Sequence, residues 1–355
     1  MKGPTHLVDE LTMSETVPVP PVKGRLKMSD VARMAGVSTS TVSRALAGNP
    51  LIPKTLRDEI TALAAEAGYV VDQSARSLRL RKTNTVAVVI PLGHEASQLI
   101  SDPFFLEMLG RLADEITTRN HAVLLIKEID PQAGWLDRII QSHRADGLLV
   151  IGQSNQHEAL NAAAVQYRPM VVWGGHLPDS SYCVVGVNNI EGAKQAVDHL
   201  IAQGRTRIAF LGEPSAPEVG LRRLGYEQAL SDAGLVAPPE LSAPAHFTTA
   251  NAYEAAKALI DSGARFDAIF AASDVIAIAA IRALSEVGLR TPEDVSVVGF
   301  DDIAIARQSL PPLTTIHQDL EGGAKQMVDL LFRRMDGEDT LSCTIAADLI
   351  RRGSS

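Results

Sequence analysis

Short apolar runs alternate with stretches of helical periodicity along most of this chain. From Thr85 onward, strand-like runs such as 85–91, 122–128 and 147–152 are each followed by a helical pattern. Runs that are apolar at nearly every position are typical of parallel strands covered by helices on both faces. About ten such strands are too many for one doubly wound sheet of ordinary size. The pattern therefore predicts an α/β core of two doubly wound parallel-sheet lobes.

The order of the runs indicates where the two lobes divide. We expect the core at 84–355, with lobe 1 at about 84–187 plus 319–347 and lobe 2 at about 188–318 plus the C-terminal end. The chain would recross between the lobes near Thr315 to Gln318. Sheets of this kind bind ligands at the carboxyl ends of their strands, so two lobes predict one shared cleft.

Three shorter helical patterns precede the core. The first has its apolar positions at Val31, Ala32, Met34 and Ala35 and stops at Gly36, which accepts a left-handed turn without steric cost. The second begins at the N-cap residue Ser38 and turns Val42, Ala45 and Leu46 inward, leaving an outer face of Thr39, Ser40, Thr41, Ser43 and Arg44. The third has apolar positions from Leu56 to Ala67 and ends at Gly68 before Tyr69. This arrangement predicts a helix-turn-helix domain over 27–71, with Thr39, Ser40 and Arg44 contacting bases.

Charge separates the helical segment from the rest of the chain. Residues 23–82 hold eleven Lys or Arg and five Asp or Glu, a net charge of +6, whereas the whole chain carries −9. A basic face favours phosphate binding because binding releases counterions, while an acidic remainder limits unspecific adhesion. A solvated α-hairpin that binds nothing has no need of this segregation. We therefore expect double-stranded operator DNA as a partner.

Motifs along nearly all of the chain after residue 26 resemble the lactose/galactose repressor (LacI/GalR) family. They include AGVSTSTVSRAL at 35–46, SARSLRLRKTNTVAVVIP at 74–91, GRTRIAFLG at 204–212, VSVVGFDD at 295–302 and PPLTTIHQD at 311–319. The resemblance implies an N-terminal all-α helix-turn-helix domain plus an α/β periplasmic-binding-protein-like core.

The same resemblance implies a hinge helix or linker at 72–83 that folds only on the operator, where Leu78 wedges the minor groove. The expected DNA contacts are then Ser38, Thr39, Ser40, Thr41, Ser43, Arg44, Tyr69, Ala75, Arg76 and Leu78. Ahead of this module, residues 1–23 hold four prolines and no apolar run, which predicts a disordered tail over 1–26.

Polar and aromatic side chains follow several predicted strands and could hold a ligand. The candidates are Ser101, Asp102, Phe104, Trp173, Arg222, Phe247, Asp274, Asp301 and Gln318. Carboxylates and an arginine can grip sugar hydroxyls, and aromatic rings can cover the apolar faces of a sugar. The family resemblance implies effector contacts at Asp102, Arg222, Asp274 and Asp301.

Each of these candidates also has a structural interpretation. Arg222 and Asp301 could form an ion pair between the lobes. Asp102 could cap a helix that starts at Pro103, and Asp274 could cap the helix predicted at 274–287. A tryptophan such as Trp173 belongs to the core more often than to a binding surface.

Three positions depart from residues that the family often carries: Gly174, His246 and Ser273. We expect all three to lie in the pocket, so the identity of the effector cannot be carried over from the family.

Several classes of function lack any support in the sequence. There is no G-x-G-x-x-G, G-x-x-x-x-G-K-[ST], H-E-x-x-H or G-x-S-x-G motif, so we expect no enzyme. Cys183 and Cys343 lack the spacing of a zinc site or a redox pair and are predicted to be buried structural thiols, with no metal and no cofactor. No apolar stretch is long enough for a membrane span or a signal peptide, which predicts a cytoplasmic protein.

The combined expectation is a sequence-specific DNA-binding transcriptional regulator. It would repress carbohydrate-utilisation genes and leave a palindromic operator when a small sugar-type effector binds. One short recognition helix contacts too few base pairs for genomic specificity, which predicts a homodimer or a tetramer. Two alternatives stay open: a corepressor-dependent regulator that responds to a purine or a phosphoprotein, and a sugar-binding protein without DNA function.

Overall fold

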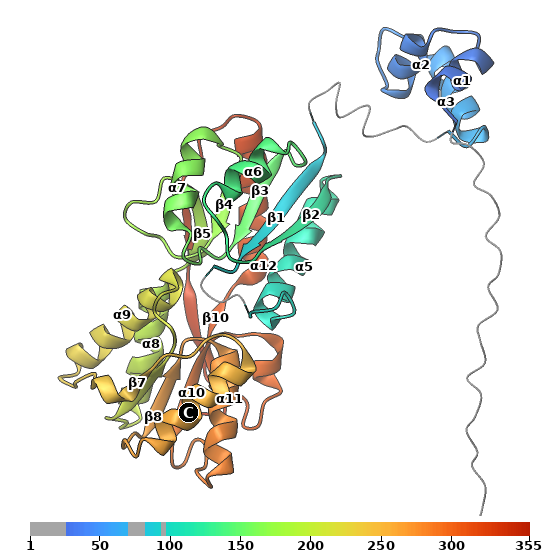
Figure 1. Cartoon of the computed structure of the whole chain (residues 1–355). Helices are drawn as coiled ribbons and strands as arrows, with labels where there is room; N and C mark the ends of the chain where they lie inside the picture. The colour runs from blue at the N-terminus through green and yellow to red at the C-terminus, as the bar shows by residue number, and fades with distance from the viewer. Residues whose placement is uncertain (1–25, 70–81, 94–96) are drawn as a thin grey trace, which may run out of the picture. The chain divides into compact units, whose positions relative to one another are not determined.

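The computed structural model describes residues 26–69, 82–93 and 97–355, in two compact units, Met1–Arg79 and Leu80–Ser355. Figure 1 shows the described helices and strands of both units. The predicted hinge and tail, with Ala75, Arg76 and Leu78, lie largely outside the described residues.

The N-terminal unit consists of three helices around a small apolar core. Their bounds are α1 (Met28–Met34), α2 (Thr39–Leu46) and α3 (Lys54–Glu66). The core contains Val31, Ala32, Val42, Ala45, Ile60 and Ala64. Gly36 makes the turn between α1 and α2 with a φ of +66°, a conformation that costs glycine little. The helix-turn-helix predicted from the sequence is therefore present.

Two side chains of this unit depart from the predicted faces. Met34 was expected in the apolar face of α1 but is 52% exposed, because it lies roughly 110° around the helix from the centre of the face formed by Val31, Ala32 and Ala35. Ser43 was expected to point outward but is buried. Helix α2 packs against both α1 and α3, so its buried arc is wider than a single stripe.

The larger unit contains two six-stranded sheets. The first has the order β11-β5-β4-β3-β1-β2 and is parallel throughout; the second has the order β12-β10-β9-β8-β6-β7 and is parallel except for β12, which runs antiparallel to β10. The strands of the first sheet are β1 (Thr85–Pro91), β2 (Ala122–Glu128), β3 (Gly147–Ile151), β4 (Met170–Trp173), β5 (Cys183–Val187) and β11 (Cys343–Ile345). Those of the second are β6 (Ile208–Leu211), β7 (Ser242–Ala243), β8 (Ala268–Ala271), β9 (Ser296–Asp301), β10 (Thr314–Gln318) and β12 (Ala347–Ile350).

Helices cover the first sheet on both faces because its strands are apolar on both sides. On β1, Val86, Val88 and Ile90 face α5 (Pro103–Thr118) and α12 (Leu320–Met335). The alternate residues Ala87 and Val89 face α6 (Trp135–Gln141) and α7 (His157–Gln166). This is the two-sided burial that the continuous apolar runs predicted.

The second sheet is covered by α8 (Asn189–Ala202), α9 (Pro217–Asp232), α10 (Thr249–Asp261) and α11 (Asp274–Glu286), which share one apolar core with it. Two short 3₁₀ helices, η1 (Pro239–Leu241) and η2 (Ala304–Arg307), complete this lobe. The chain passes between the lobes three times: between β5 and α8, between β10 and α12, and between β11 and β12 (Figure 1). Three crossings join the lobes at one side and leave the ends of the strands facing each other.

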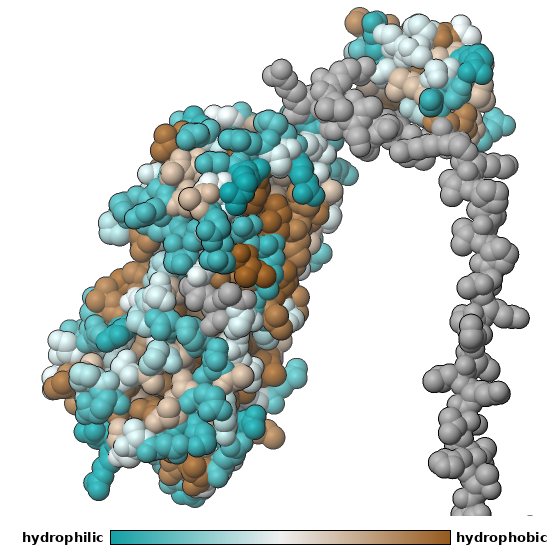
Figure 2. Space-filling view, in the orientation of Figure 1, coloured by the Kyte–Doolittle hydropathy of each residue, from teal (hydrophilic) through white to brown (hydrophobic). Residues whose placement is uncertain are grey.

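Strand β2 departs from the buried pattern, as do the short strands β7 and β11. It lies at the edge of the first sheet and none of its residues is fully buried. Leu125 on this strand, Ile129 just after it and Leu106 on α5 are all exposed. Figure 2 shows apolar side chains gathered on this side of the lobe. An exposed apolar edge strand is a surface on which another chain can pair.

The burial of the two cysteines and the length of the helices can be compared with what the sequence predicted. Cys183 is buried, and burial raises the pKa of its thiol. Cys343 is only partly buried, because its short strand β11 lies at the sheet edge; the prediction of two buried thiols was half wrong. In the described part of the chain, no helix has the length and apolar character needed to cross a membrane.

Candidate DNA-binding face and effector cavity

The N-terminal end of α2 presents small hydroxyl side chains and an arginine. Ser38 caps the helix by accepting a hydrogen bond from the Thr41 backbone N–H at 3.1 Å, the arrangement that satisfies a free N–H at a helix start. Thr39, Ser40 and Arg44 are exposed, whereas Thr41 is half-buried and also contacts the Ser38 hydroxyl at 2.9 Å. The geometry leaves Thr39, Ser40 and Arg44 free of the domain core and facing solvent.

Two other predicted DNA contacts have structural surroundings. Ser43 is enclosed by the packing of α2, and Tyr69 lies half-buried against the three-helix core. The Tyr69 backbone N–H donates to the Ala64 carbonyl at 2.8 Å, which closes the C-terminal end of α3. We therefore assign Ser43 to the domain core.

Arg57 fixes the loop between α2 and α3. Its Nη1 donates to the Gly48 carbonyl at 2.9 Å, while the Asn49 carboxamide accepts the Leu51 N–H at 2.9 Å. These two contacts hold the C-terminal end of α2 in place.

A cavity lies between the lobes at the carboxyl ends of the strands, where the sequence pattern placed it. Its volume is about 660 Å³, counting the part open to solvent. The lining residues are Pro91, Gln98, Asp102, Phe104, Phe105, Ile151, Gly152, Ser154, Trp173, Ala216, Glu218, Arg222, Phe247, Ser273, Val275 and Asp301. Aromatic and aliphatic walls with a few polar groups suit a ring-shaped polar ligand.

Arg222 is held by several groups of lobe 2. Its Nε donates to Asn189 Oδ1 at 2.8 Å and its Nη1 donates to the Ala272 carbonyl at 2.5 Å. The guanidinium lies over the Phe300 ring at 3.8 Å from the centroid, and Nη1 is 3.6 Å from Asp301 Oδ1. The pair expected as an alternative thus exists, but it lies within lobe 2 and does not join the lobes.

Asp301 ends strand β9 in a strained conformation. Its φ is +120°, unusual for any residue other than glycine. It accepts a hydrogen bond from Gln318 Nε2 at 2.6 Å. Burial raises the pKa of its carboxyl to about 7 despite the opposing effects of Arg222 and Gln318. Strain together with an unfavourable charge is typical of a residue retained for function.

Asp102 caps a helix, the structural role that the sequence left open, and it also lies at the cavity. Its Oδ1 accepts the Phe104 N–H at 2.9 Å as the cap of α5, and its Oδ2 accepts from Gln98 Nε2 at 3.1 Å. The carboxyl also lines the cavity. Burial raises its pKa.

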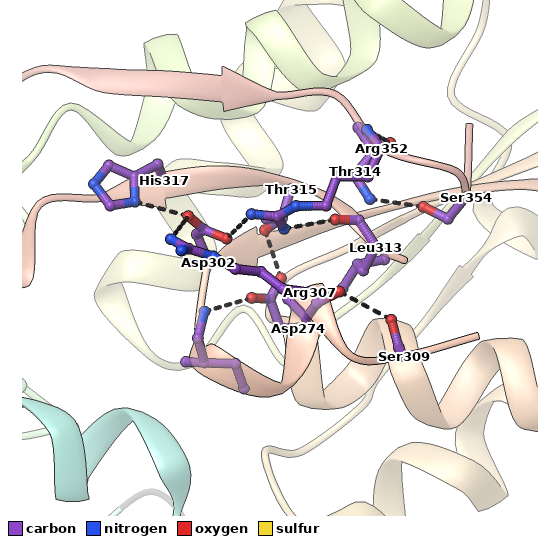
Figure 3. A network of polar contacts seen from close by, with 12 residues as sticks. Asp274, Asp302, Arg307, Ser309, Leu313, Thr314, Thr315, His317, Arg352 and Ser354 are labelled. Carbon is purple, nitrogen blue, oxygen red and sulfur yellow. Dashed lines mark hydrogen bonds and ion pairs between the residues drawn. The ribbon is translucent and has the colours of Figure 1, made fainter. Parts of the chain in front are cut away.

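Asp274 and Asp302 do not line the cavity and belong to a polar network of lobe 2 (Figure 3). Asp274 accepts the Ile303 N–H at 2.9 Å and the Thr315 hydroxyl at 2.5 Å, and it is fully buried. Ser273, not Asp274, caps α11 by accepting the Ile276 N–H at 3.3 Å. Asp274 thus supports the strand ends and does not line the cavity, and Ser273 has the cap role that was its alternative.

Asp302 is contacted by two arginines and a histidine. Arg352 donates to Oδ1, and Arg307 and His317 lie 3.3 and 3.0 Å from Oδ2. Arg352 comes from the C-terminal end of the chain, so this contact closes the last residues onto lobe 2 (Figure 3).

Some of the remaining predicted residues line the cavity and others do not. Phe104, Trp173 and Phe247 line the cavity, and Trp173 is at the same time buried in the core of lobe 1. Ser101 lines a smaller adjoining hollow that shares Asp102 and Phe247 with the cavity. Gln318 does not line the cavity but positions Asp301.

The sequence did not indicate three polar residues of the wall: Gln98, Ser154 and Glu218. Gln98 lies in the loop before α5, and Glu218 lies in the first turn of α9, where its Oε1 accepts the Gln153 N–H at 3.1 Å. Glu218 could have been found as an acid in the first turn of a helix that follows a strand. Gln98 carries no comparable signal.

Of the three departures, only Ser273 lines the cavity. Gly174 lies elsewhere and leaves room for Gln153, because a Cβ at this glycine would meet the Gln153 side chain at 2.7 Å. His246 precedes Phe247 and does not line the cavity either. The expectation that all three lie in the pocket was wrong, since a position after a strand does not determine whether the residue faces the cavity.

A three-helix domain with a helix-turn-helix, in one chain with a two-lobed core around a ligand-sized cavity, defines the class of DNA-binding proteins that also bind a small molecule. The chain belongs to the lacI family of bacterial regulatory proteins: residues 27–72 match that family, and residues 197–355 match the periplasmic binding protein-like domain.

Similar proteins cover nearly the full length. The HTH-type transcriptional regulator CelR of Thermobifida fusca is 33% identical over 87% of this chain and 92% of its own. The HTH-type transcriptional repressor CytR of Escherichia coli K12 is 32% identical over 92% of this chain and 96% of its own. A solved complex of a transcriptional regulator CelR with cellobiose has a TM-score of 0.68 at 30% identity, over 93% of this chain and all of that one. These relatives are regulators rather than enzymes.

Proposed function

We propose that this protein is a transcriptional repressor that leaves its operator when an uncharged sugar-type molecule enters the cavity between the lobes. The observation that carries the proposal is the cavity itself. It brings Asp102, Arg222 and Asp301 together with the rings of Phe104 and Phe247. Carboxylates and a guanidinium can hold hydroxyl groups while flat rings cover apolar sugar faces. As a regulator of bacterial genes, it would act in the cytoplasm.

The polar side chains of the cavity come from both lobes, so one ligand can contact both lobes at once. Asp102 comes from lobe 1, whereas Arg222 and Asp301 come from lobe 2. A ligand that contacts all three favours one arrangement of the lobes over another. It can shift the DNA-bound state only by its difference in affinity for the two arrangements.

DNA recognition is assigned to the exposed face of α2. Thr39, Ser40 and Arg44 face solvent at the helix start, the part of a recognition helix that meets base edges. Ser38 would support this face as the cap. Arginine is well suited to a bidentate contact with guanine.

A dimer would match the two-fold symmetry of a palindromic operator. The exposed apolar surface around Leu106, Leu125 and Ile129, beside the edge strand β2, is a surface on which a second copy could pair. Replacing Leu125 by Glu should convert a dimer into monomers in light scattering and weaken operator binding, because two linked half-sites bind far more tightly than one.

The test of the proposed function is operator binding in the presence of ligands. A palindromic fragment selected from random DNA by the full-length protein would be labelled, and its binding measured with cellobiose, ribose, glucose and a purine. Release by at least one of them supports the proposal. Tighter binding with a purine would instead favour a corepressor-dependent regulator, and absence of DNA binding would leave a sugar-binding protein.

A further inference from the structure

The effector cavity is lined by more acidic groups than basic groups. Among the described residues that line it, three carry a carboxyl, Asp102, Glu218 and Asp301, and one carries a positive charge, Arg222. Arg222 is already engaged, since its Nε and Nη1 donate to Asn189 and to the Ala272 carbonyl. The cavity wall is therefore rich in carboxyl groups and poor in free cations.

Burial acts on all three carboxyls in the same direction. It raises the pKa of Asp102, of Glu218 and of Asp301. Burial disfavours the charged form of an acid unless nearby cations or hydrogen-bond donors compensate. An anion placed beside these carboxyls would raise their pKa values further, so it could bind only against like charges or with the uptake of protons.

Hydrogen-bond acceptors also outnumber donors in the wall. The Oε1 atom of Gln98 is buried and has no hydrogen-bond partner within the described part of the chain. Its Nε2 is already used in the bond to Asp102. An unpaired buried acceptor is costly and gains from a ligand that donates to it.

Glu218 occupies the position where lobe 1 meets lobe 2. Its Oε1 accepts the Gln153 backbone N–H at 3.1 Å, across the boundary between α9 and the loop after β3. The Gln153 side chain is itself fixed by hydrogen bonds to Gly175 and Tyr182. Glu218 is thus anchored through one oxygen, and a carboxylate has acceptor capacity at both of its oxygens.

We propose that the cavity selects an effector that carries no negative charge and offers several hydrogen-bond donors, and that Glu218 enforces this selection. The inference rests on the proposed function and narrows its ligand class. A phosphate group would lie beside carboxylates with one engaged guanidinium to offset them. Like charges placed together in a site cost enough to weaken binding by about a hundredfold or more.

The test uses full-length protein and pairs of compounds that differ only in a phosphate. Unfolding midpoints and calorimetric affinities would be measured with glucose, glucose 6-phosphate, ribose, ribose 5-phosphate, cellobiose, adenosine and adenosine 5′-monophosphate. The variants are Glu218→Gln and, as a matched control, Glu227→Gln. Glu227 is on the same helix but pairs with Arg223 at 2.9 Å outside the cavity lining.

The wild type should bind at least one uncharged compound and discriminate against its phosphorylated partner by about a hundredfold or more. Glu218→Gln should reduce that discrimination by at least about tenfold, because it removes one charge and keeps the shape. Glu227→Gln should leave it unchanged.

Three results would overturn the inference: a phosphorylated compound that binds the wild type as tightly as its partner, unchanged discrimination in Glu218→Gln, or binding of none of the uncharged compounds. The proposed function is tested separately by adding the same compounds to the operator complex. If the discrimination is found but no compound alters operator binding, the selectivity stands and the regulatory function fails.

Discussion

Replacing Asp301 by Asn should stabilise the fold at neutral pH, although the residue lies in the candidate site. The folded protein holds the Asp301 proton up to a pKa of about 7, whereas the ordinary value is 3.8. Between these values the unfolded chain has released a proton that the folded chain retains. Wild-type stability therefore falls as the pH rises from about 4 to about 7, and this group causes no further loss above that.

The magnitude follows from the size of the pKa difference. At about 1.4 kcal/mol per unit, a difference of about 3 units has an upper limit of about 4 kcal/mol. Asn leaves Arg222 without a carboxylate at 3.6 Å, which offsets part of the gain, so we expect a net stabilisation of about 1–3 kcal/mol at pH 7.5. At pH 4.5 the two proteins should be nearly equal.

Asp302 provides the matched comparison. It is the next residue along the chain and equally buried, but Arg352, Arg307 and His317 surround it. Asp302→Asn should therefore destabilise the protein by about 3 kcal/mol, because it leaves buried positive charge unpaired. Urea titrations followed by circular dichroism at both pH values would measure all three proteins. A loss of stability in Asp301→Asn at pH 7.5 similar to that in Asp302→Asn would refute the reasoning and make the Arg222 pair a stabilising contact.

Three further predictions concern the two sites. Arg44→Ala should cost about 1–3 kcal/mol of binding on the selected operator and far less on random DNA in fluorescence anisotropy; equal losses on both would make Arg44 a phosphate contact. Ser38→Ala should speed hydrogen exchange of the first α2 amides by an amount equal to about 1 kcal/mol, because the cap bond to Thr41 is lost; unchanged exchange would show that the cap contributes nothing. Effector affinity should weaken as the pH falls below about 7, by up to about tenfold per unit, since a protonated Asp301 accepts poorly from a hydroxyl; a flat profile between pH 5.5 and 7.5 in calorimetry would remove Asp301 from the contact.

The pattern of apolar residues predicted most of the fold for a simple reason. Parallel strands buried on both faces are apolar throughout, so β1, β3, β5 and β9 are visible as runs. Strands β7 and β11 have only two and three residues, and β12 is buried at one of its four positions, so none of the three forms an apolar run. Helix α10 was missed because alanines, Ala252 and Ala256, make much of its core contact. Helix α12 was not predicted either, although its sequence carries a clear apolar stripe.

The candidate site was predicted less completely because position after a strand does not determine where a side chain points. Asp301 and Asp302 are neighbours, yet one lines the cavity and the other joins the Arg352 network. Asp274 lies at a helix start as predicted, but its oxygens are used by Ile303 and Thr315. These differences depend on tertiary contacts between segments far apart in the chain.

The central claim is that the cavity and the DNA-binding face are coupled, and coupling must be reciprocal. Calorimetry would measure the affinity of an effector found in the ligand panel for the free protein and for the protein saturated with operator. The account predicts that operator weakens effector binding by the same factor by which effector weakens operator binding, about 5–150-fold, and that Arg222→Ala abolishes the difference. Equal effector affinity with and without operator would contradict it.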